Sequence, residues 1–234
     1  MRLFQIAITL FMLSCGGTQV PAPSVPDPVN ESGKTQYLAL GDSYTIGQSV
    51  SVDERWPAIL TAELKSNGKS VAAPQIIART GWTTRNLLDA LEQAPPTGTP
   101  SGTFDVVSLL IGVNNQYQGR NLEEYRVEFR QLLTKSIGYA GGEAEKVFVL
   151  SIPDWGVTAF GEGNRDHIAA EIDRFNAVAK EECDKQKILF IDITGISRTA
   201  LGDPTMLASD QLHFSGKMYK LWVNEVLPQV RRLF

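Results

Sequence analysis

The stretch Tyr37-Leu38-Ala39-Leu40-Gly41-Asp42-Ser43-Tyr44 reads as a buried strand that ends in a turn. Its first four residues are apolar, and buried strands are short apolar runs bounded by turn residues. Ser43 follows two residues after Gly41, and open parallel sheets carry their chemistry just beyond the carboxyl ends of their strands. Ser43 is therefore a candidate nucleophile, although Gly-Asp-Ser is also an ordinary turn tripeptide.

Strand-like and helix-like segments alternate from this stretch to the end of the chain. Apolar runs predict strands at 36–41, 71–79, 104–112, 146–152 and 188–193. Helical periodicity predicts helices at 55–66, 84–93, 122–137 and 166–185, and a last one that begins at Gly216 with Ser215 as its N-cap. Strict alternation implies right-handed βαβ units and a parallel sheet covered on both faces. The sequence thus predicts an α/β fold, a three-layer α/β/α sandwich around a five-stranded parallel sheet.

The composition is that of a globular protein, with 43% hydrophobic and 21% charged residues. A chain of 234 residues suffices for one sizeable core. The formal net charge of -4 argues against a nucleic-acid-binding surface.

The first 34 residues read as a leader and a tether. Arg2 precedes a mostly apolar stretch, 3–13, which is too short to span a bilayer core of about 30 Å. Ser14-Cys15-Gly16 follows, and the whole resembles a bacterial lipoprotein signal in which Cys15 is lipidated and becomes the mature N-terminus. An ordinary signal peptide with a chance cysteine is the alternative. Residues 16–34 carry four prolines among small and polar residues, which predicts a flexible tether. We therefore expect a leader at 1–15, a tether at 16–34 and one folded domain at 35–234, anchored by lipid to a membrane of the bacterial cell envelope, on the periplasmic or surface side of an outer membrane.

In a parallel sheet, the segments that follow the strands gather at one edge. Two histidines occur in the chain, which limits the choice of a base for Ser43. His213 lies three residues after Asp210, so one turn can present both, with the carboxylate on one ring nitrogen and Ser43 facing the other. His167 falls on the solvated side of a predicted helix. Asp154 and Asp192 follow predicted strands and are rival acids. Asp210 is preferred because it is close to His213 in the sequence, so their contact does not depend on tertiary packing.

Donors for an oxyanion are also found after the strands. The backbone N–H groups of Ser43 and Gly81 and the side-chain amide of Asn114 can converge between the first and third strands. Gly81 permits a close approach of the chain. A turn residue that bonds its own backbone is the alternative role for Asn114.

These residues resemble, in order, the four sequence blocks of the SGNH (GDSL-type) hydrolase family: Gly41-Asp42-Ser43, Gly81, Gly112-Val113-Asn114 and Asp210-Gln211-Leu212-His213. The resemblance covers the chain from about Tyr37 to Phe234. It implies a flavodoxin-like fold and a serine esterase with Ser43 as nucleophile, Asp210 and His213 completing the triad, and Ser43, Gly81 and Asn114 as oxyanion donors. It implies neither a metal nor a cofactor. Three positions depart from the family pattern: Asn115 stands where Asp is usual, and Gln211 and Phe214 replace the frequent Gly and Pro.

Two other site types are excluded by their motifs. Tyr44-Thr45 follows Ser43, so the second glycine of the Gly-x-Ser-x-Gly nucleophile elbow is absent. Gly161-Glu162-Gly163 leads to Asp166 where a dinucleotide fingerprint requires Gly or Ala.

Aromatic residues on the same edge suggest a substrate pocket, formed by Trp82, Tyr117, Trp155 and Phe160, although such side chains also pack under loops. The short loops favour an open site for short acyl groups, such as acetyl esters of small molecules or carbohydrate. Lysophospholipid or thioester hydrolysis on longer chains is the alternative, and a non-catalytic envelope binding lipoprotein is the alternative of another class. The expected partners are a small-molecule ester and, through the N-terminal lipid only, a membrane. The sequence carries no signal for an oligomeric state.

Overall fold

The computed structural model describes residues 33–96 and 102–234. Its strands are β1 (Tyr37–Gly41), β2 (Gln75–Ala78), β3 (Val106–Leu110), β4 (Val147–Leu150) and β5 (Leu189–Ile191). Its α-helices are α1 (Ser43–Ile46), α2 (Trp56–Ser66), α3 (Thr84–Gln93), α4 (Val113–Tyr117), α5 (Leu122–Tyr139), α6 (Arg165–Gln186), α7 (Thr194–Arg198) and α8 (Gly216–Val230).

The five strands form one sheet in the order β2-β1-β3-β4-β5. Every pair is parallel, and Leu40 of β1 lies opposite Ile77 on one side and Leu109 on the other. This is the flavodoxin-like order, and the predicted five-stranded parallel sheet is confirmed. The strand order reverses at β1, so ligands are expected at its carboxyl end, beside Ser43.

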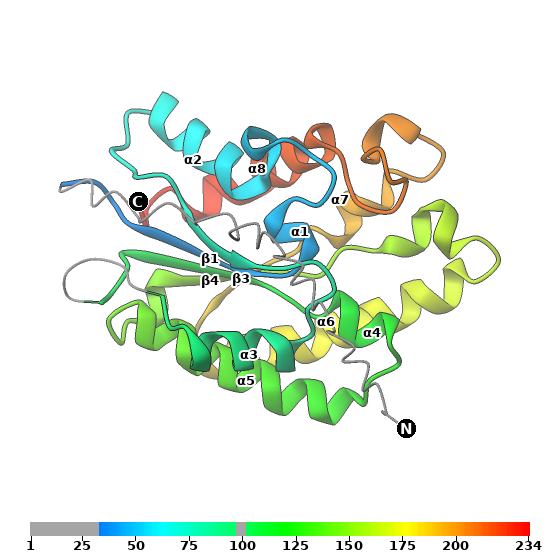
Figure 1. The fold of residues 1–234 in the computed structure, drawn as a ribbon, viewed down its shortest axis with the longest axis horizontal. Coiled ribbons are helices and arrows are strands. Elements are labelled where there is room, and N and C mark those ends of the chain that lie inside the picture. The colour runs from blue at the N-terminus through cyan, green and yellow to red at the C-terminus, as the bar shows by residue number, and fades with distance from the viewer. Residues whose placement is uncertain (1–32, 97–101) are drawn as a thin grey trace, which may run out of the picture.

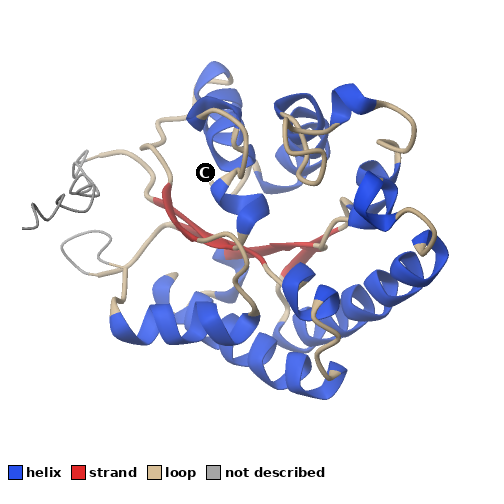
Figure 2. Cartoon of the chain, turned by 45° about the vertical axis from the view of Figure 1, so that its right-hand side comes forward, coloured by secondary structure: helices blue, strands red, loops and turns tan. Residues whose placement is uncertain are grey.

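Helices cover both faces of the sheet (Figures 1 and 2). Helices α2 and α8 pack together on one face, with α1 and α7, and α3, α5 and α6 lie on the other. The burial of β1, β3 and β4 along their whole length explains why their sequences are apolar runs rather than alternating patterns. Trp56 of α2 and Trp222 of α8 are fully buried on the first face.

The segment before β2 differs from the prediction. The apolar pattern predicts a strand at 71–79, whereas the ladder begins only at Gln75 and ends at Ala78. Val71 forms an isolated bridge with Thr35. Pro74 stands between the two paired parts, and a proline has no N–H to give to a strand ladder.

The long helices match the predicted ones within two residues at each end. Ser215 accepts a hydrogen bond from the Met218 N–H, which confirms it as the N-cap of α8. Three short helices were not predicted: α1, α4 and α7. Each has five residues or fewer, too few to show a helical period.

The leader predicted at 1–15 and most of the tether predicted at 16–34 lie outside the described residues. Within the part that is described, no helix is long and apolar enough to cross a membrane.

Candidate active site

The candidate nucleophile Ser43 opens α1 directly after β1. Asp42 caps this helix, with its Oδ1 accepting the Tyr44 N–H at 3.0 Å. Gly41 is required at the strand end, because a Cβ there would lie 2.5 Å from the carbonyl oxygen of Leu110 and overlap Thr45. The tight passage from β1 into α1 therefore sets the position of Ser43, which is buried.

Asp210 and His213 meet as the sequence predicts. Nδ1 of His213 lies 2.7 Å from Oδ2 of Asp210, and Oδ1 of Asp210 accepts the N–H groups of Leu212 and His213 at 3.0 and 2.9 Å. Because an ionised carboxylate only accepts hydrogen bonds, Nδ1 carries the proton and Nε2 is left as the basic nitrogen.

Ser49 is a further member of this group that the sequence did not indicate. Its hydroxyl donates to Oδ2 of Asp210 at 2.7 Å. Its φ of 64° lies in the left-handed region, a conformation that the sequence around a serine does not predict. Partial burial opposes the charge on Asp210, but hydrogen bonds from the His213 N–H, the Ser49 hydroxyl and the Leu212 N–H outweigh it. They hold the pKa of the Asp210 carboxyl well below its usual range.

The helix that carries Ser43 lies against this acid–base pair. The ring centroids of Tyr44 and His213 are 5.2 Å apart, and Ser49, which bonds Asp210, lies just after the same helix. The structure thus brings the strand end of β1 and the loop before α8 together. His167, in contrast, is exposed on α6.

The two rival acids are engaged elsewhere. Asp154 is buried and accepts a hydrogen bond from Arg198 at 2.9 Å. Asp192 accepts hydrogen bonds from Ser151 and from the Thr194 N–H, at 2.9 and 2.8 Å. Asp210 is the acid that the structure places on a histidine.

The segments after β2 and β3 are tied together beside β1. Nδ2 of Asn114 donates to the Trp82 carbonyl at 2.9 Å, and the Thr80 hydroxyl donates to Oε1 of Gln48, after α1, at 2.6 Å. The chain turns at Gly81 with a φ of 84°, which glycine adopts at little cost. An amide nitrogen has two donors, so Asn114 keeps one N–H for another acceptor. Asn114 lies on α4, whose first turn it helps to form.

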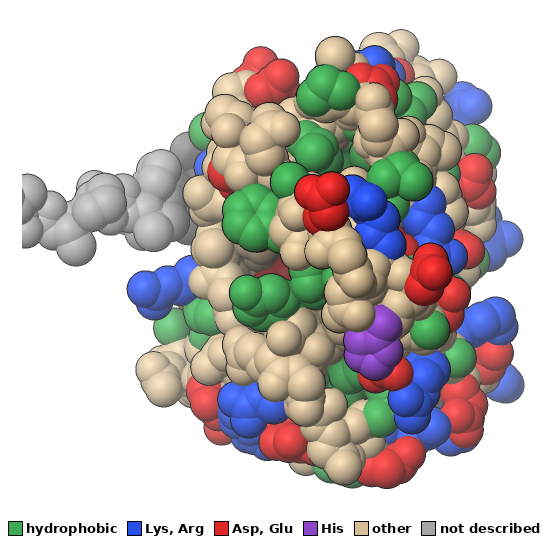
Figure 3. Space-filling view, turned by 90° about the vertical axis from the view of Figure 1, so that its right-hand side faces the viewer, with side chains coloured by type: hydrophobic (Ala, Val, Ile, Leu, Met, Phe, Trp, Pro, Cys, Tyr) green, Lys and Arg blue, Asp and Glu red, His purple; other side chains and the backbone are tan. Residues whose placement is uncertain are grey.

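The predicted pocket aromatics divide into buried and exposed groups. Trp155 is buried and its Nε1 donates to Gln116 at 2.7 Å, which ties the segment after β4 to α4. Tyr117 is 65% exposed and contacts Trp155 edge to face. Phe160 is 61% exposed, and Trp82 is half-buried. Figure 3 shows this side of the molecule, where hydrophobic side chains are exposed among polar ones.

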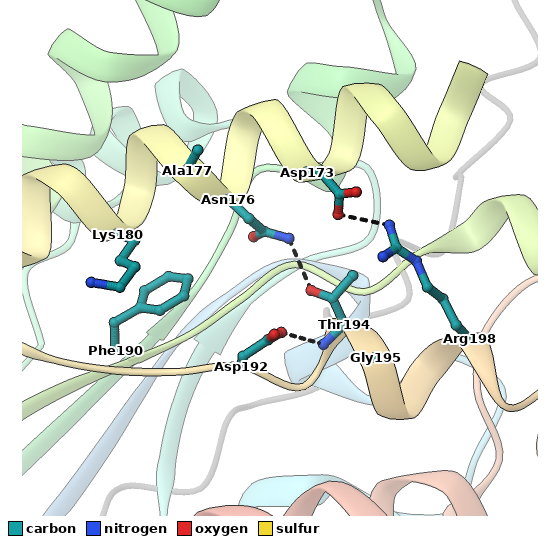
Figure 4. Close-up of a pocket in the computed structure, with 9 residues that line it drawn as sticks. All are labelled: Asp173, Asn176, Ala177, Lys180, Phe190, Asp192, Thr194, Gly195 and Arg198. Carbon is teal, nitrogen blue, oxygen red and sulfur yellow. Dashed lines mark hydrogen bonds and ion pairs between the residues drawn. The ribbon is translucent and has the colours of Figure 1, made fainter. Parts of the chain in front are cut away.

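A separate hollow of about 390 Å³ lies between α6, the end of β5 and α7 (Figure 4). Two pairs of its polar groups bond one another: Asn176 donates to Thr194 at 2.9 Å and Arg198 to Asp173 at 2.7 Å. These bonds fix the junction of α6 and α7, and the hollow offers no acid–base pair like that of Asp210 and His213. Among the described residues, no group of three or more His, Cys, Asp or Glu is placed to hold a metal ion.

Burial raises the pKa of the Asp42 carboxyl to about 7, although hydrogen bonds from backbone N–H groups partly oppose the shift. Oδ2 of Asp42 is buried and has no hydrogen-bond partner. Because the folded-state pKa lies above the ordinary value of 3.8, the folded protein is stabilised by the neutral acid, and this stabilisation is lost as the pH rises from there through about 7.

We therefore expect Asp42→Asn, which stays neutral and can still cap α1, to remove that loss of stability. At about pH 8 the variant should exceed the wild type by up to roughly 4 kcal/mol in free energy of unfolding, and at low pH the two should converge. Urea unfolding of both proteins at about pH 5 and about pH 8 measures this. Equal pH slopes for the two proteins would contradict the assignment.

The fold and this geometry define a class: a flavodoxin-like α/β protein with a hydroxyl, an imidazole and a carboxylate gathered at the carboxyl edge of the sheet. A sequence model of the GDSL-like lipase/acylhydrolase family matches residues 39–221. The chain belongs to this family and is an ester-hydrolysing enzyme.

Solved structures agree in fold. TesA has a TM-score of 0.63 and 18% identity, with 86% of this chain and 100% of that chain covered. Axe2, an acetylxylan esterase from Geobacillus stearothermophilus, has a TM-score of 0.62 and 18% identity, with 84% of this chain and 94% of that chain covered. The lipase/acylhydrolase from Enterococcus faecalis has a TM-score of 0.61 and 23% identity over 85% and 96%. No curated protein sequence is similar enough to count as a match.

Proposed function

We propose that the enzyme hydrolyses carboxylic esters through an acyl-enzyme on Ser43. The observation that carries this proposal is the bonded pair of Asp210 and His213 beside the helix that Ser43 opens. Nε2 of His213 takes the proton of the Ser43 hydroxyl as Oγ attacks the ester carbonyl, and the same proton passes to the departing alcohol. Water then attacks the acyl-enzyme with His213 again as the base, which releases the acid and restores Ser43.

The negative charge of each tetrahedral intermediate needs donors that are already in place. In this proposal they are the N–H groups of Ser43 and Gly81 and the free N–H of the Asn114 amide. The hydrogen bond from Asn114 to Trp82 supports this assignment, because it holds the two segments that carry Gly81 and Asn114 together.

For the substrate we propose short acyl groups, such as acetyl, on small molecules or carbohydrate. Aromatic packing next to Ser43 in the sequence supports this: the ring of Tyr44 contacts His213 and Phe214. After β4, Trp155 is buried and donates to Gln116. Exposed Tyr117 offers an aromatic surface to the alcohol half of the ester. Longer acyl chains, as in lysophospholipids or thioesters, are the alternative.

A series of nitrophenyl esters tests the acyl preference. We expect kcat/KM to fall by at least about tenfold between acetate and octanoate if the acyl site takes short groups, as proposed. The measurement uses monomeric substrate below its solubility limit. Val127→Ser is the control for adsorption of long chains to exposed apolar groups, because Val127 is exposed on α5 and belongs to no candidate site. A kcat/KM that rises up to eight carbons and beyond would refute the short-acyl proposal, not the mechanism.

We also propose that the enzyme is anchored in the bacterial cell envelope by a lipid on Cys15. The support is the sequence alone: the apolar stretch 3–13, Ser14-Cys15-Gly16 and the proline-rich segment after it. In cells, Cys15→Ser should move the protein from the membrane fraction to the soluble fraction. Retention of the variant in the membrane fraction would mean that another part of the leader holds it there.

A further inference from the structure

Three buried polar side chains link the segments that carry Gly81 and Asn114 to helix α5. The Thr84 N–H donates to Oδ1 of Asn115 at 3.0 Å, and Nδ2 of Asn115 donates back to the Thr84 hydroxyl at 2.7 Å. The hydroxyl in turn donates to Oε2 of Glu128 at 2.5 Å. Thr84, Asn115 and Glu128 are 0%, 2% and 5% exposed, so these bonds have no competition from solvent.

The bond from the Thr84 N–H to Asn115 determines the direction of the other hydrogen bonds in this series. A backbone N–H can only donate, so the Asn115 atom that faces Thr84 N must be the oxygen, and its nitrogen must face the hydroxyl. The hydroxyl then accepts from Asn115 and has its proton left for Glu128. Nε of Arg85 donates to the other carboxylate oxygen of Glu128 at 3.0 Å, so both oxygens have a donor.

This series of hydrogen bonds connects the segments on the two sides of β1. Thr84 begins α3, two residues after Trp82, and Asn115 is the neighbour of Asn114 on α4. These segments follow β2 and β3, the strands on either side of β1.

One face of α5 supports both segments. Glu128 holds the start of α3, and Tyr125, three residues earlier, lies against Gly112 at the start of α4. A Cβ at Gly112 would lie 2.9 Å from the Tyr125 ring, so α5 and this turn are in close contact. Residues three apart lie on the same side of a helix, and both are buried here.

We propose that Glu128 is a positioning residue for the oxyanion site, which acts through Thr84 and Asn115 to hold the Gly81 segment at a set distance from Asn114. The proposal rests on the proposed function, because it takes Gly81 and Asn114 as the donors. Glu128 itself does not touch the substrate. Its role is to accept the hydrogen bond from the Thr84 hydroxyl, because this bond fixes the orientation of Thr84 and Asn115.

The polarity of the chain gives a test by paired substitution. Asn115→Asp alone leaves two carboxylates competing for the single Thr84 hydroxyl proton. Glu128→Gln alone turns an amide nitrogen toward Thr84, or toward Arg85 if the amide rotates. Together, the two changes reverse the chain: both Thr84 donors go to the introduced aspartate, and the introduced glutamine donates to the Thr84 oxygen and accepts from Arg85.

Each single variant should lower kcat by about 10- to 100-fold, with little change in KM, because misplaced donors affect the transition state more than substrate binding. The kcat of the double variant should return to within about threefold of the wild-type value. If the two sites were independent, its loss of kcat would instead equal the product of the two single losses. Asn114→Ala gives the reference for a lost donor, at about 10²- to 10³-fold. Glu182→Gln is the matched control: this buried carboxylate binds Arg126 and Arg130 away from the site, so it should lower the Tm and leave kcat unchanged.

Two outcomes would overturn the proposal. The first is a double variant whose loss of kcat is at least the product of the two single losses. The second is a pair of single variants that have a lower Tm but the wild-type kcat, as expected for Glu182→Gln. If a single variant does not fold, the Thr84 pair decides instead: Thr84→Ser should keep kcat and Thr84→Val should lose it, and equal kcat values would refute the proposal. The coupling of Asn115 and Glu128 in Tm is independent of catalysis, so it separates a failure of this proposal from a failure of the Ser43 mechanism.

Discussion

Replacing Ser43 by alanine is expected to reduce kcat by roughly 10⁶-fold while KM changes little. The substitution removes the oxygen that forms the acyl-enzyme, and the other hydroxyl described at the Asp210–His213 pair, that of Ser49, donates to Asp210 and not to His213. The fold should be unaffected, because the Tyr44 N–H that stabilises the helix start is bonded to Asp42 and not to Ser43.

Steady-state kinetics on nitrophenyl acetate, with the Tm of each protein, measure this effect. Ser66→Ala is the matched control, since Ser66 is exposed at the end of α2 and its hydroxyl bonds only the Glu63 carbonyl. Ser66→Ala should keep the wild-type kcat. Esterase activity in Ser43→Ala above about 1% of the wild type, in a preparation free of contaminating esterase, would refute the mechanism.

Asp210→Asn should reduce kcat by about 10⁴-fold through the tautomer of His213. The backbone N–H groups of Leu212 and His213 require an oxygen at Oδ1, so the amide nitrogen must face Nδ1 of His213. Nδ1 then becomes the acceptor, Nε2 carries the proton, and the imidazole cannot take the proton of Ser43.

The rival strand-end acid supplies the control for this experiment. Asp192→Asn should leave kcat within about threefold of the wild type, because Asp192 bonds Ser151 and Thr194 and no histidine. The measurement is kcat/KM against pH for the three proteins. An Asp210→Asn loss as small as that of Asp192→Asn would remove Asp210 from the mechanism.

The elements that a sequence pattern could reveal were the strands, which are apolar runs, and the helices that are long enough to show a period. The five strands and the long helices were predicted because β1, β3 and β4 are buried on both faces and because α3, α5, α6 and α8 each span several turns. Helices α1, α4 and α7 have no such signal, and Pro74 interrupts an apolar run that continues on both sides of it.

The same limit applies to the site. Asp210 and His213 are three residues apart, so their contact follows from a single turn, and the structure confirms it at 2.7 Å. Glu128 and Thr84 are 44 residues apart, and Ser49 and Asp210 are 161 apart. No local pattern predicts these contacts, because they depend on how α5 packs under the sheet and on the left-handed backbone at Ser49.

Gln211 illustrates how a departure from a family pattern can be accommodated. Its φ is 60°, in the region that glycine enters most easily, which explains why a glycine is frequent there. The hydrogen bonds that Asp210 accepts from the Leu212 and His213 N–H groups span this residue and hold the turn in place without glycine.

Labelling with a fluorophosphonate tests whether Ser43 is the activated nucleophile, because this reagent bonds covalently to a serine that is activated by a base. The full chain is treated with the probe, digested and analysed by mass spectrometry, beside Ser43→Ala and His213→Ala. We expect one adduct, on the peptide that contains Ser43. It should be absent from Ser43→Ala and strongly reduced in His213→Ala. An adduct on a different residue, or labelling that persists in Ser43→Ala, would show that Ser43 is not the nucleophile.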